Sequence, residues 1–217
     1  MKAWLNALFY PEKCIFCGKV LDENETDLCR NCRKTAPEFP GSKIKLSFLA
    51  QWTGLWYYKE NVRQSLLRYK FYGRRSYAAV YGRLLAMKLQ STDNTQWDVL
   101  SWVPISRLRR WGRGFDQSQL LAEAVSRELG VPAVQTLRKV RNTRPQSGLG
   151  TAAHRRANVL GAYEAVDSAN WSGKRILLLD DVVTTGATAS ECAKTLLLAG
   201  AKEIQLATIA VATHDKR

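Results

Sequence analysis

The sequence RILLLDDVVTTGATA, residues 175–189, joins an aliphatic run to two adjacent aspartates and a turn rich in threonine. The run 175–179 is typical of a buried parallel strand. The turn opens a predicted helix that reaches about Ala199, and the first turn of a helix offers free N–H groups and a partial positive charge to a phosphate. Ligands of open parallel sheets bind where strands lead into helices, so this segment predicts a binding site at the carboxyl edge of such a sheet.

The residues of this turn point to a sugar phosphate as the ligand. The carboxylates of Asp180 and Asp181 would repel a phosphate and instead suit vicinal hydroxyl groups or a metal ion. A phosphate would meet the hydroxyl and backbone N–H groups of Thr184, Thr185, Gly186, Ala187 and Thr188. A ribose 5-phosphate moiety satisfies both demands. One alternative is the acidic strand of a P-loop ATPase, which also needs GxxxxGK[ST], and the sequence has no such stretch. The other is a plain strand-turn-helix with a solvated acidic pair.

The rest of the chain alternates predicted strands and helices. Strands are expected within 46–60 and at 97–104, 175–179 and 203–212. Helices are expected over 62–89, divided at Gly73, over 116–129 and after the turn at 184–188. This alternation predicts an α/β fold, a parallel sheet with helices on both faces. The segment after Pro104, rich in glycine and arginine, is expected to be a loop, and 139–154 a long polar loop of the functional kind.

Four cysteines form two CxxC pairs, and the segment 18–28 lies between the pairs. Cys14, Cys17, Cys29 and Cys32 can occupy the corners of a tetrahedron, which predicts a structural Zn²⁺ site in a small zinc ribbon. Two disulfides, or a redox motif, are the alternatives. A short helix is expected before the ribbon, from the spacing of Trp4, Leu5, Leu8 and Phe9. The expected domains are therefore 1–41, a helix with a four-cysteine zinc ribbon, and 42–217, the α/β domain. Cys192 is expected to be a small core residue.

The chain is strongly basic, with 33 lysines and arginines against 19 acidic residues and a formal net charge of +14. Such an excess favours a polyanionic partner, either nucleic acid or a phosphate-rich ligand, although a merely soluble basic surface is the alternative. No apolar run approaches the length needed to span a bilayer, so no membrane insertion and a cytoplasmic location are expected.

The segment ILLLDDVVTTGAT, residues 176–188, resembles the signature with which type I phosphoribosyltransferases bind phosphoribosyl pyrophosphate (PRPP). Together with the paired CxxC motifs and the segments 103–122 and 144–164, it makes nearly the whole chain similar to the ComF family of competence proteins. The resemblance implies a type I phosphoribosyltransferase-like fold with an N-terminal zinc ribbon. It also implies PRPP bound with Mg²⁺, and displacement of pyrophosphate from ribose C1. Asp180 and Asp181 would be the catalytic acids, bound to the ribose 2′- and 3′-hydroxyls.

The same resemblance implies roles for two further segments. The pyrophosphate would be bound after Pro104, by Arg107, Arg109, Arg110 and Arg113, whose guanidinium groups suit a diphosphate. Residues 139–154 would form a hood that closes over the site and excludes water. Asp116-Gln117 stands where this family usually has Asn-Gln, which adds a charge near the diphosphate. No general base is assigned, because single histidines such as His154 and His214 are more often ordinary surface or loop residues.

A third basic segment, RQSLLRYKFYGRR at 63–75, interleaves cations with aromatic rings. This pattern is typical of single-stranded nucleic acid binding, and the candidate residues are Arg68, Tyr69, Lys70, Arg74 and Arg75. An amphipathic helix with aromatic core residues explains the pattern equally well. Similarity to ComF proteins implies single-stranded DNA and proteins of the DNA-uptake machinery as partners. Two hypotheses therefore stand: an enzyme that uses PRPP, whose acceptor the sequence does not identify, or a non-catalytic DNA-binding competence factor with PRPP as a regulatory ligand or its site as a relic.

Overall fold

The computed structural model describes residues 11–41, 44–91, 96–143 and 152–212. The helices are α2 (Arg30–Thr35), α3 (Glu60–Phe71), α4 (Tyr77–Ser91), α5 (Arg107–Arg113), α6 (Gln117–Leu129), α7 (Ala152–Val159) and α8 (Ala187–Leu198). The strands are β1 (Gln51–Tyr57), β2 (Val99–Trp102), β3 (Leu137–Lys139), β4 (Tyr163–Ala165), β5 (Arg175–Val183) and β6 (Glu203–Val211). The helix predicted at Trp4–Phe9 lies outside the described residues.

Four strands form a parallel sheet in the order β1-β6-β5-β2. β5 lies inside the sheet and pairs with β6 along its length, from Arg175 opposite Glu203 to Val183 opposite Val211. Because the strands run in one direction, their carboxyl ends meet at one edge. The predicted α/β class is confirmed, and so is the division of the long helical segment, since α3 and α4 are separated at Gly73.

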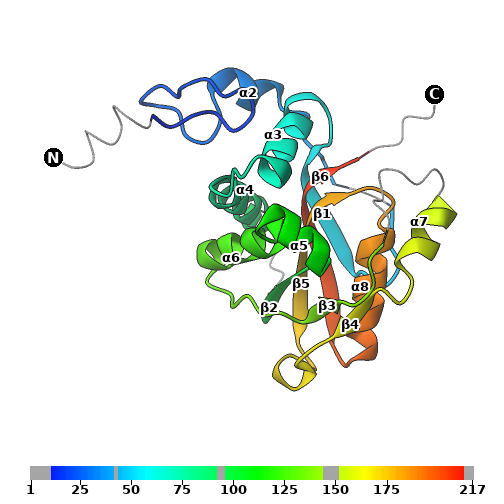
Figure 1. The fold of residues 1–217 in the computed structure, drawn as a ribbon. Helices are drawn as coiled ribbons and strands as arrows, with labels where there is room; N and C mark the ends of the chain where they lie inside the picture. Colours follow the sequence, from blue (N-terminus) through cyan, green and yellow to red (C-terminus); the bar gives the residue numbers. More distant parts are fainter. Residues whose placement is uncertain (1–10, 42–43, 92–95, 144–151, 213–217) are drawn as a thin grey trace.

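The side chains of β5 alternate between two hydrophobic cores, one on each face of the sheet. Leu177 and Leu179 pack with residues of α3, α4 and α6, whereas Ile176 and Leu178 pack with residues of α8. Figure 1 shows the same arrangement, with α4 and α6 on one side of the sheet and α8 on the other. Cys192 is fully buried in the α8 core, as predicted.

The segment after Pro104 was expected to be a loop, and this expectation is wrong, because residues 107–113 form the short helix α5. The Ser106 side chain accepts from the Arg109 N–H at 3.4 Å and so caps the amino end of α5. Gly114 closes the other end in the left-handed conformation (φ 74°), with its N–H bonded to the Arg110 carbonyl. Gly112 and Gly114 led to the prediction of a loop, because glycine is unfavourable within a helix.

Two further boundaries differ from the predictions. β5 continues through both aspartates to Val183, so the acids stand within a strand rather than directly after it. Residues 139–154 are not one loop, because Lys139 ends β3 and residues 152–154 begin α7, while 144–151 lie outside the described residues.

β3 and β4 form a separate two-stranded antiparallel sheet that was not predicted, in which Lys139 faces Tyr163.

The cysteine-rich module packs directly on the α/β domain. The Phe16 ring meets the Trp56 ring of β1 edge to face, with centroids 5.0 Å apart. Arg68 of α3 donates to the carbonyls of Ile15 at 2.9 Å and Phe16 at 2.6 Å. The module and α3 thus share one hydrophobic core. The domain boundary at 41/42 stays a prediction.

None of the helices within the described ranges is long and apolar enough to cross a membrane.

Candidate functional site

A cavity of about 800 Å³ lies at the carboxyl edge of the sheet. The end of β5 and the start of α8 line it on one side, and α3 and α5 line it on another. Residues from β3, β4, α6 and α7, together with Tyr58 and the segment 103–105, also contribute. Asp180 and Asp181 line this pocket together with Thr184, Thr185, Gly186, Ala187 and Thr188. The structure therefore brings the predicted ribose and phosphate residues into one cavity of the size typical of ligand sites.

The two aspartates have different surroundings. Asp181 is buried, and both of its carboxylate oxygens are engaged, one by Lys70 Nζ at 2.8 Å and the other by Gln117 Nε2 at 2.9 Å. Asp180 is half-exposed to the pocket, and its Oδ1 accepts from the Asp181 N–H at 2.8 Å and from the Ser118 hydroxyl at 3.3 Å. Asp180 is thus the member of the pair that faces a ligand.

The two acids also differ in their electrostatic surroundings. The Asp180 carboxyl lies inside the pocket, and this desolvation, together with the neighbouring negative charge of Asp181, raises its pKa to about 8. Asp181 instead forms an ion pair with the ammonium of Lys70 at 2.8 Å. When it is protonated, the Asp180 carboxyl can donate to a ligand hydroxyl as well as accept from one.

The segment predicted to bind phosphate, residues 184–188, has a fixed backbone. Gly186 takes the left-handed conformation (φ 74°) immediately before α8, and a Cβ there would lie 2.4 Å from Cδ2 of Leu46. Only glycine fits this position without displacing Leu46. The Thr185 hydroxyl accepts from the Ala187 N–H at 3.4 Å. The turn therefore presents the amino end of α8 to the pocket, the arrangement that suits a phosphate.

The four predicted pyrophosphate residues divide into two pairs. Arg109 and Arg113 line the pocket, whereas Arg107 and Arg110 are exposed and do not. Arg109 donates to the Thr143 carbonyl at 2.7 Å and so reaches from α5 to the segment after β3.

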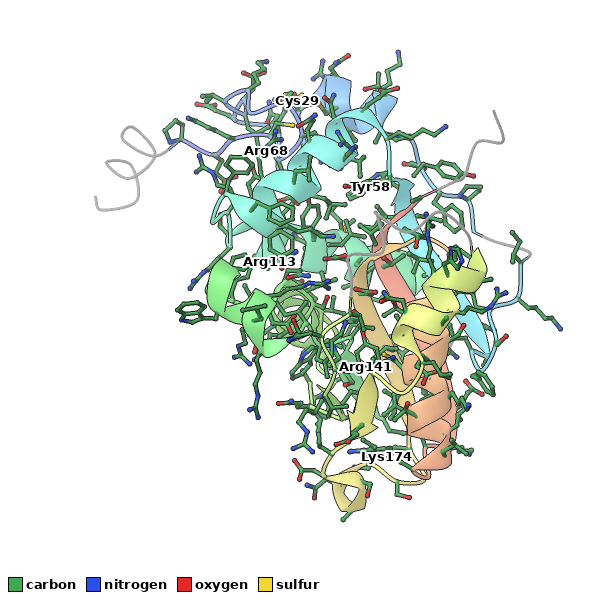
Figure 2. The ribbon with its side chains drawn as sticks, turned by 45° about the vertical axis from the view of Figure 1, so that its right-hand side comes forward. Cys29, Tyr58, Arg68, Arg113, Arg141 and Lys174 are labelled. Atoms are coloured by element: carbon green, nitrogen blue, oxygen red, sulfur yellow. The ribbon has the colours of Figure 1, made fainter. Side chains whose placement is uncertain are left out.

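Arg113, labelled in Figure 2, connects the pocket with an exposed ring. It donates to Gln117 Oε1 at 2.8 Å, and its guanidinium lies 4.8 Å from the centroid of Phe71. The same Gln117 amide donates to Asp181, so one side chain joins a pocket cation to a pocket acid.

Asp116 has a structural position at the edge of the site. Its Oδ1 accepts from the N–H groups of Ser118 at 3.0 Å and Gln119 at 3.2 Å, which caps α6. Its Oδ2 accepts from the Ile105 N–H at 3.0 Å and so fixes the segment that leads into α5. The side chain is buried, and it does not line the pocket.

The candidate nucleic-acid residues of 63–75 do not share one surface, and three of them make contacts within the protein. Tyr69 is fully buried and donates to the Gln117 carbonyl at 2.6 Å, so its ring offers no face to a base. Arg68 is bound to the cysteine module, where Figure 2 shows it beneath Cys29. Lys70 points into the pocket, toward Asp181. Arg74 and Arg75 are exposed, as the prediction requires.

Several pocket residues were not foreseen from the sequence. Lys139 donates to the Tyr163 hydroxyl at 3.0 Å across the β3–β4 pair, and burial, followed by the charge of Arg109, lowers its pKa to about 8. Tyr58, Arg63 and Leu67 form the wall on the α3 side. The helical spacing of Arg63, Leu67 and Lys70 was the available signal, since it predicts that they share a face.

The four N-terminal cysteines converge at one point, where their sulfur atoms all lie within 4.8 Å of one another. The sulfur atoms of Cys17 and Cys29 are 3.7 Å apart, and all four thiols are free of disulfides. Zn–S bonds of about 2.3 Å in a tetrahedron place sulfur atoms about 3.8 Å apart, so the cluster fits such an ion. Burial raises the pKa of the Cys14 thiol. Hydrogen bonds from the backbone N–H groups of Cys17 and Cys29 lower it by more, so the pKa is about 7.

Comparisons with known proteins agree with this geometry. Residues 116–217 match the phosphoribosyl transferase domain family. Competence protein F of Haemophilus influenzae is 30% identical over 223 residues, which cover 91% of this chain and 96% of that protein. The DNA utilization protein YhgH of Salmonella typhi is 36% identical over 63% of this chain and 61% of its own length. Among solved structures, a glutamine PRPP amidotransferase from B. subtilis is 23% identical over 65% of this chain and 30% of that chain, with a TM-score of 0.45.

Proposed function

We propose that this chain, which belongs to the ComF family of competence proteins and carries a phosphoribosyltransferase domain, binds PRPP in the pocket at the carboxyl edge of its sheet and transfers the phosphoribosyl group to an acceptor. One observation carries the proposal. A single cavity of about 800 Å³ contains an acid able to meet ribose hydroxyls, a helix amino end suited to a phosphate, and two arginines suited to a diphosphate.

Each part of PRPP has a counterpart in this cavity. The 5-phosphate would bind the N–H and hydroxyl groups at 184–188, and the ribose hydroxyls would meet Asp180. The diphosphate, with its Mg²⁺, would lie toward Arg109 and Arg113. Lys70 and Lys139 add two more cations to the pocket walls, so the cavity is electropositive around the acid pair.

Transfer breaks the bond between ribose C1 and the pyrophosphate oxygen, and the electron pair leaves with pyrophosphate. The acceptor then forms the new bond to C1. The sugar is positively charged in the transition state, and the ionised Asp181 beside Asp180 favours that charge. The guanidinium groups of Arg109 and Arg113 favour the departing diphosphate.

The first test is calorimetric titration of the protein with PRPP and Mg²⁺. At pH 9, where the Asp180 carboxyl has lost its proton, we expect the wild type to bind and Asp180→Asn to bind at least tenfold more weakly, because the amide lacks the carboxylate charge and acceptor strength. Asp167→Asn is the matched control, since Asp167 is exposed, lies outside the pocket and has a left-handed backbone (φ 51°) that asparagine adopts readily. Unchanged binding by Asp180→Asn would contradict the ribose assignment.

We also propose that the four-cysteine cluster holds a structural Zn²⁺. Four sulfur ligands leave no open position, so the ion would stabilise the fold and take no part in the chemistry. Elemental analysis of freshly purified protein should find one zinc per chain. Absence of zinc, with the four thiols titrating as free, would refute this assignment.

Contact with single-stranded DNA is the third part of the proposal. Phe71, Tyr72 and Trp111 are 58%, 73% and 85% exposed, and they lie among the exposed cations Arg74 and Arg110. Exposed rings among cations are typical of stacking surfaces for single strands. This surface, and not Tyr69, would be the one that binds DNA. We expect affinity for an oligothymidine to fall steeply with salt, and Trp111→Ala to weaken binding by about 1–3 kcal/mol. No binding at low salt would refute this part.

The alternative function is a non-catalytic DNA-binding factor with PRPP as a regulatory ligand, working in the cytoplasm with the DNA-uptake machinery. The observation that favours it is the engagement of both Asp181 oxygens by Lys70 and Gln117. Release of pyrophosphate decides between the two. An enzyme releases it from PRPP when the acceptor is present, whereas a regulatory site binds PRPP and returns it intact.

A further inference from the structure

Two lysines line the pocket, and they differ in their partners. Lys70 is paired with Asp181 at 2.8 Å. Lys139, at the end of β3, is half-buried, and within residues 11–41, 44–91, 96–143 and 152–212 no carboxylate forms an ion pair with it. Its ammonium instead donates to the hydroxyl of Tyr163 at 3.0 Å. A partly buried cation whose partner is neutral lacks a counter-ion, and an anionic ligand in the pocket would supply one.

The β3–β4 pair fixes the position of this ammonium. Lys139 and Tyr163 stand opposite each other in the ladder, and Lys139 Nζ lies 4.9 Å from the centroid of the Tyr163 ring. The tyrosine is 5% exposed and belongs to the core on the α8 side of the sheet. Because backbone pairing and a buried ring both hold the lysine, little of its freedom is left to lose when a ligand binds.

A second cation reaches the same part of the pocket. Arg109 of α5 lines the cavity and donates to the carbonyl of Thr143, four residues after Lys139. The arginine is thus attached to the segment that follows β3, and its charge repels that of the lysine. A group with several negative oxygens relieves this repulsion. A diphosphate carries more charge than a single phosphate ester and has oxygens for both cations, so it is the part of PRPP that fits best.

The surroundings of Lys139 make its charge responsive to a ligand. Burial lowers its pKa most and Arg109 lowers it further, to about 8. Tyr163 and Cys192 of α8 also lie around it, and their own pKa values are raised, so both stay neutral. The charged groups that act on it come from α5, β5 and the start of α6: Arg109, Asp180 and Asp116. A bound anion favours the ammonium form and therefore draws a proton onto the amine.

We propose that Lys139, together with Arg109, binds the diphosphate of PRPP and holds it as it leaves ribose C1, and that the lysine takes up a proton from solvent when the diphosphate binds. When the bond between C1 and the diphosphate oxygen breaks, the electron pair stays on that oxygen. The ammonium of Lys139 then donates hydrogen bonds to a group that has gained negative charge. This inference deepens the proposed function and rests on its PRPP-binding part.

The test is calorimetric titration of the full chain with inorganic pyrophosphate and Mg²⁺. Lys139→Gln should bind pyrophosphate at least tenfold more weakly than the wild type, because a charge-assisted hydrogen bond is lost. Lys139→Arg keeps the charge and should stay within about threefold of the wild type. Lys202→Gln is the matched control, since Lys202 is exposed and does not line the pocket. Ribose 5-phosphate is the second probe, and its affinity should change by less than about threefold in Lys139→Gln.

Proton uptake is an independent readout. At pH 8.5 about three quarters of an amine with a pKa of about 8 is neutral. Pyrophosphate binding to the wild type should therefore take up more protons than binding to Lys139→Arg, whose guanidinium is always charged. Calorimetry in buffers of different ionisation enthalpy measures this number. Protons taken up by the ligand itself or by Asp180 occur in both proteins, so the difference between them belongs to Lys139.

Three results would overturn the inference and leave PRPP binding standing. Equal affinity of the wild type and Lys139→Gln for pyrophosphate would remove the lysine from the diphosphate site. A tenfold loss for ribose 5-phosphate, with pyrophosphate unaffected, would assign the lysine to the 5-phosphate instead. Equal proton uptake by the wild type and Lys139→Arg would show that the amine is already charged before the ligand binds. Failure of the wild type to bind PRPP, in contrast, would refute the proposed function and this inference with it.

Discussion

The ion pair between Lys70 and Asp181 gives the sharpest prediction of stability. The two side chains are 16% and 8% exposed, and Lys70 Nζ lies 2.8 Å from Asp181 Oδ1. Lys70→Met keeps the length and apolar stem of the side chain and removes the ammonium. Asp181 would then keep a single strong donor, Gln117, inside a poorly solvated site. The variant is expected to unfold more easily because a buried carboxylate has lost its counter-ion.

Breaking a buried ion pair by removing one partner costs about 3–5 kcal/mol. Lys70 retains some exposure to the pocket, so the lower end, about 3 kcal/mol, is expected. For a chain of this length each kcal/mol lowers Tm by about 2–4 °C, which gives a fall of about 6–12 °C. Lys19→Met is the matched control, because the Lys19–Asp22 pair is 3.4 Å long and 60% and 72% exposed. Its removal should change the stability by less than about 0.5 kcal/mol.

The assay is urea denaturation of the four members of a double-mutant cycle: wild type, Lys70→Met, Asp181→Asn and the double variant. We expect each single variant to lose about 3 kcal/mol and the double variant to lose less than their sum, since the neutral amide no longer needs the ammonium. A loss below about 1 kcal/mol in Lys70→Met, or strictly additive losses, would refute the account of a buried, coupled pair.

Three further predictions concern other parts of the site and fold. The pKa of Asp180 is raised to about 8 in the native state. Between about pH 4 and pH 8 the native state therefore holds a proton on Asp180, whereas the unfolded state has released it. The free energy of unfolding should therefore fall as the pH rises through this window. Asp180→Asn should flatten that slope in urea titrations at several pH values, and an unaltered slope would contradict the shift. Asp116→Ala removes the α6 cap and should lower the free energy of unfolding by about 1–2 kcal/mol. The same variant loses the hydrogen bond to the Ile105 N–H, so the segment that leads into α5 should loosen and calorimetry should show a lower affinity for PRPP. Cys32→Ser should abolish zinc binding and lower Tm, whereas Cys192→Ala should keep the full metal content, and equal zinc in both would disprove the four-cysteine site.

The sheet and the turn that leads from β5 into α8 could be predicted because their signals are local. Four aliphatic residues followed by two acids and a threonine-rich turn specify strand, edge and helix start within one stretch, and β5, Gly186 and α8 follow that order. α5 was missed because its capping by Ser106 and Gly114 is visible only once a helix is assumed. The β3–β4 pair was missed because its two strands are three residues long and far apart in the sequence.

The roles within the basic segment were harder to predict for a different reason. Val62, Leu66 and Tyr69 follow a helical spacing that predicts a buried face, and Tyr69 is buried with them. The amphipathic-helix alternative was therefore right for this ring. The other sides of α3 contact residues that are distant in the sequence. Lys70 binds Asp181, and Arg68 binds the Phe16 carbonyl. Periodicity identifies the faces of a helix and not the elements that meet them.

The double attachment of α3 has a consequence for cell physiology. Arg68 donates to the carbonyls of Ile15 and Phe16, which lie between the first two cysteines, and Lys70, two residues later, binds Asp181 in the pocket. If the cluster holds zinc as proposed, loss of the ion would remove the order of the cysteine module and with it the anchor of α3. The supply of this metal would then set how much of the protein has an intact pocket.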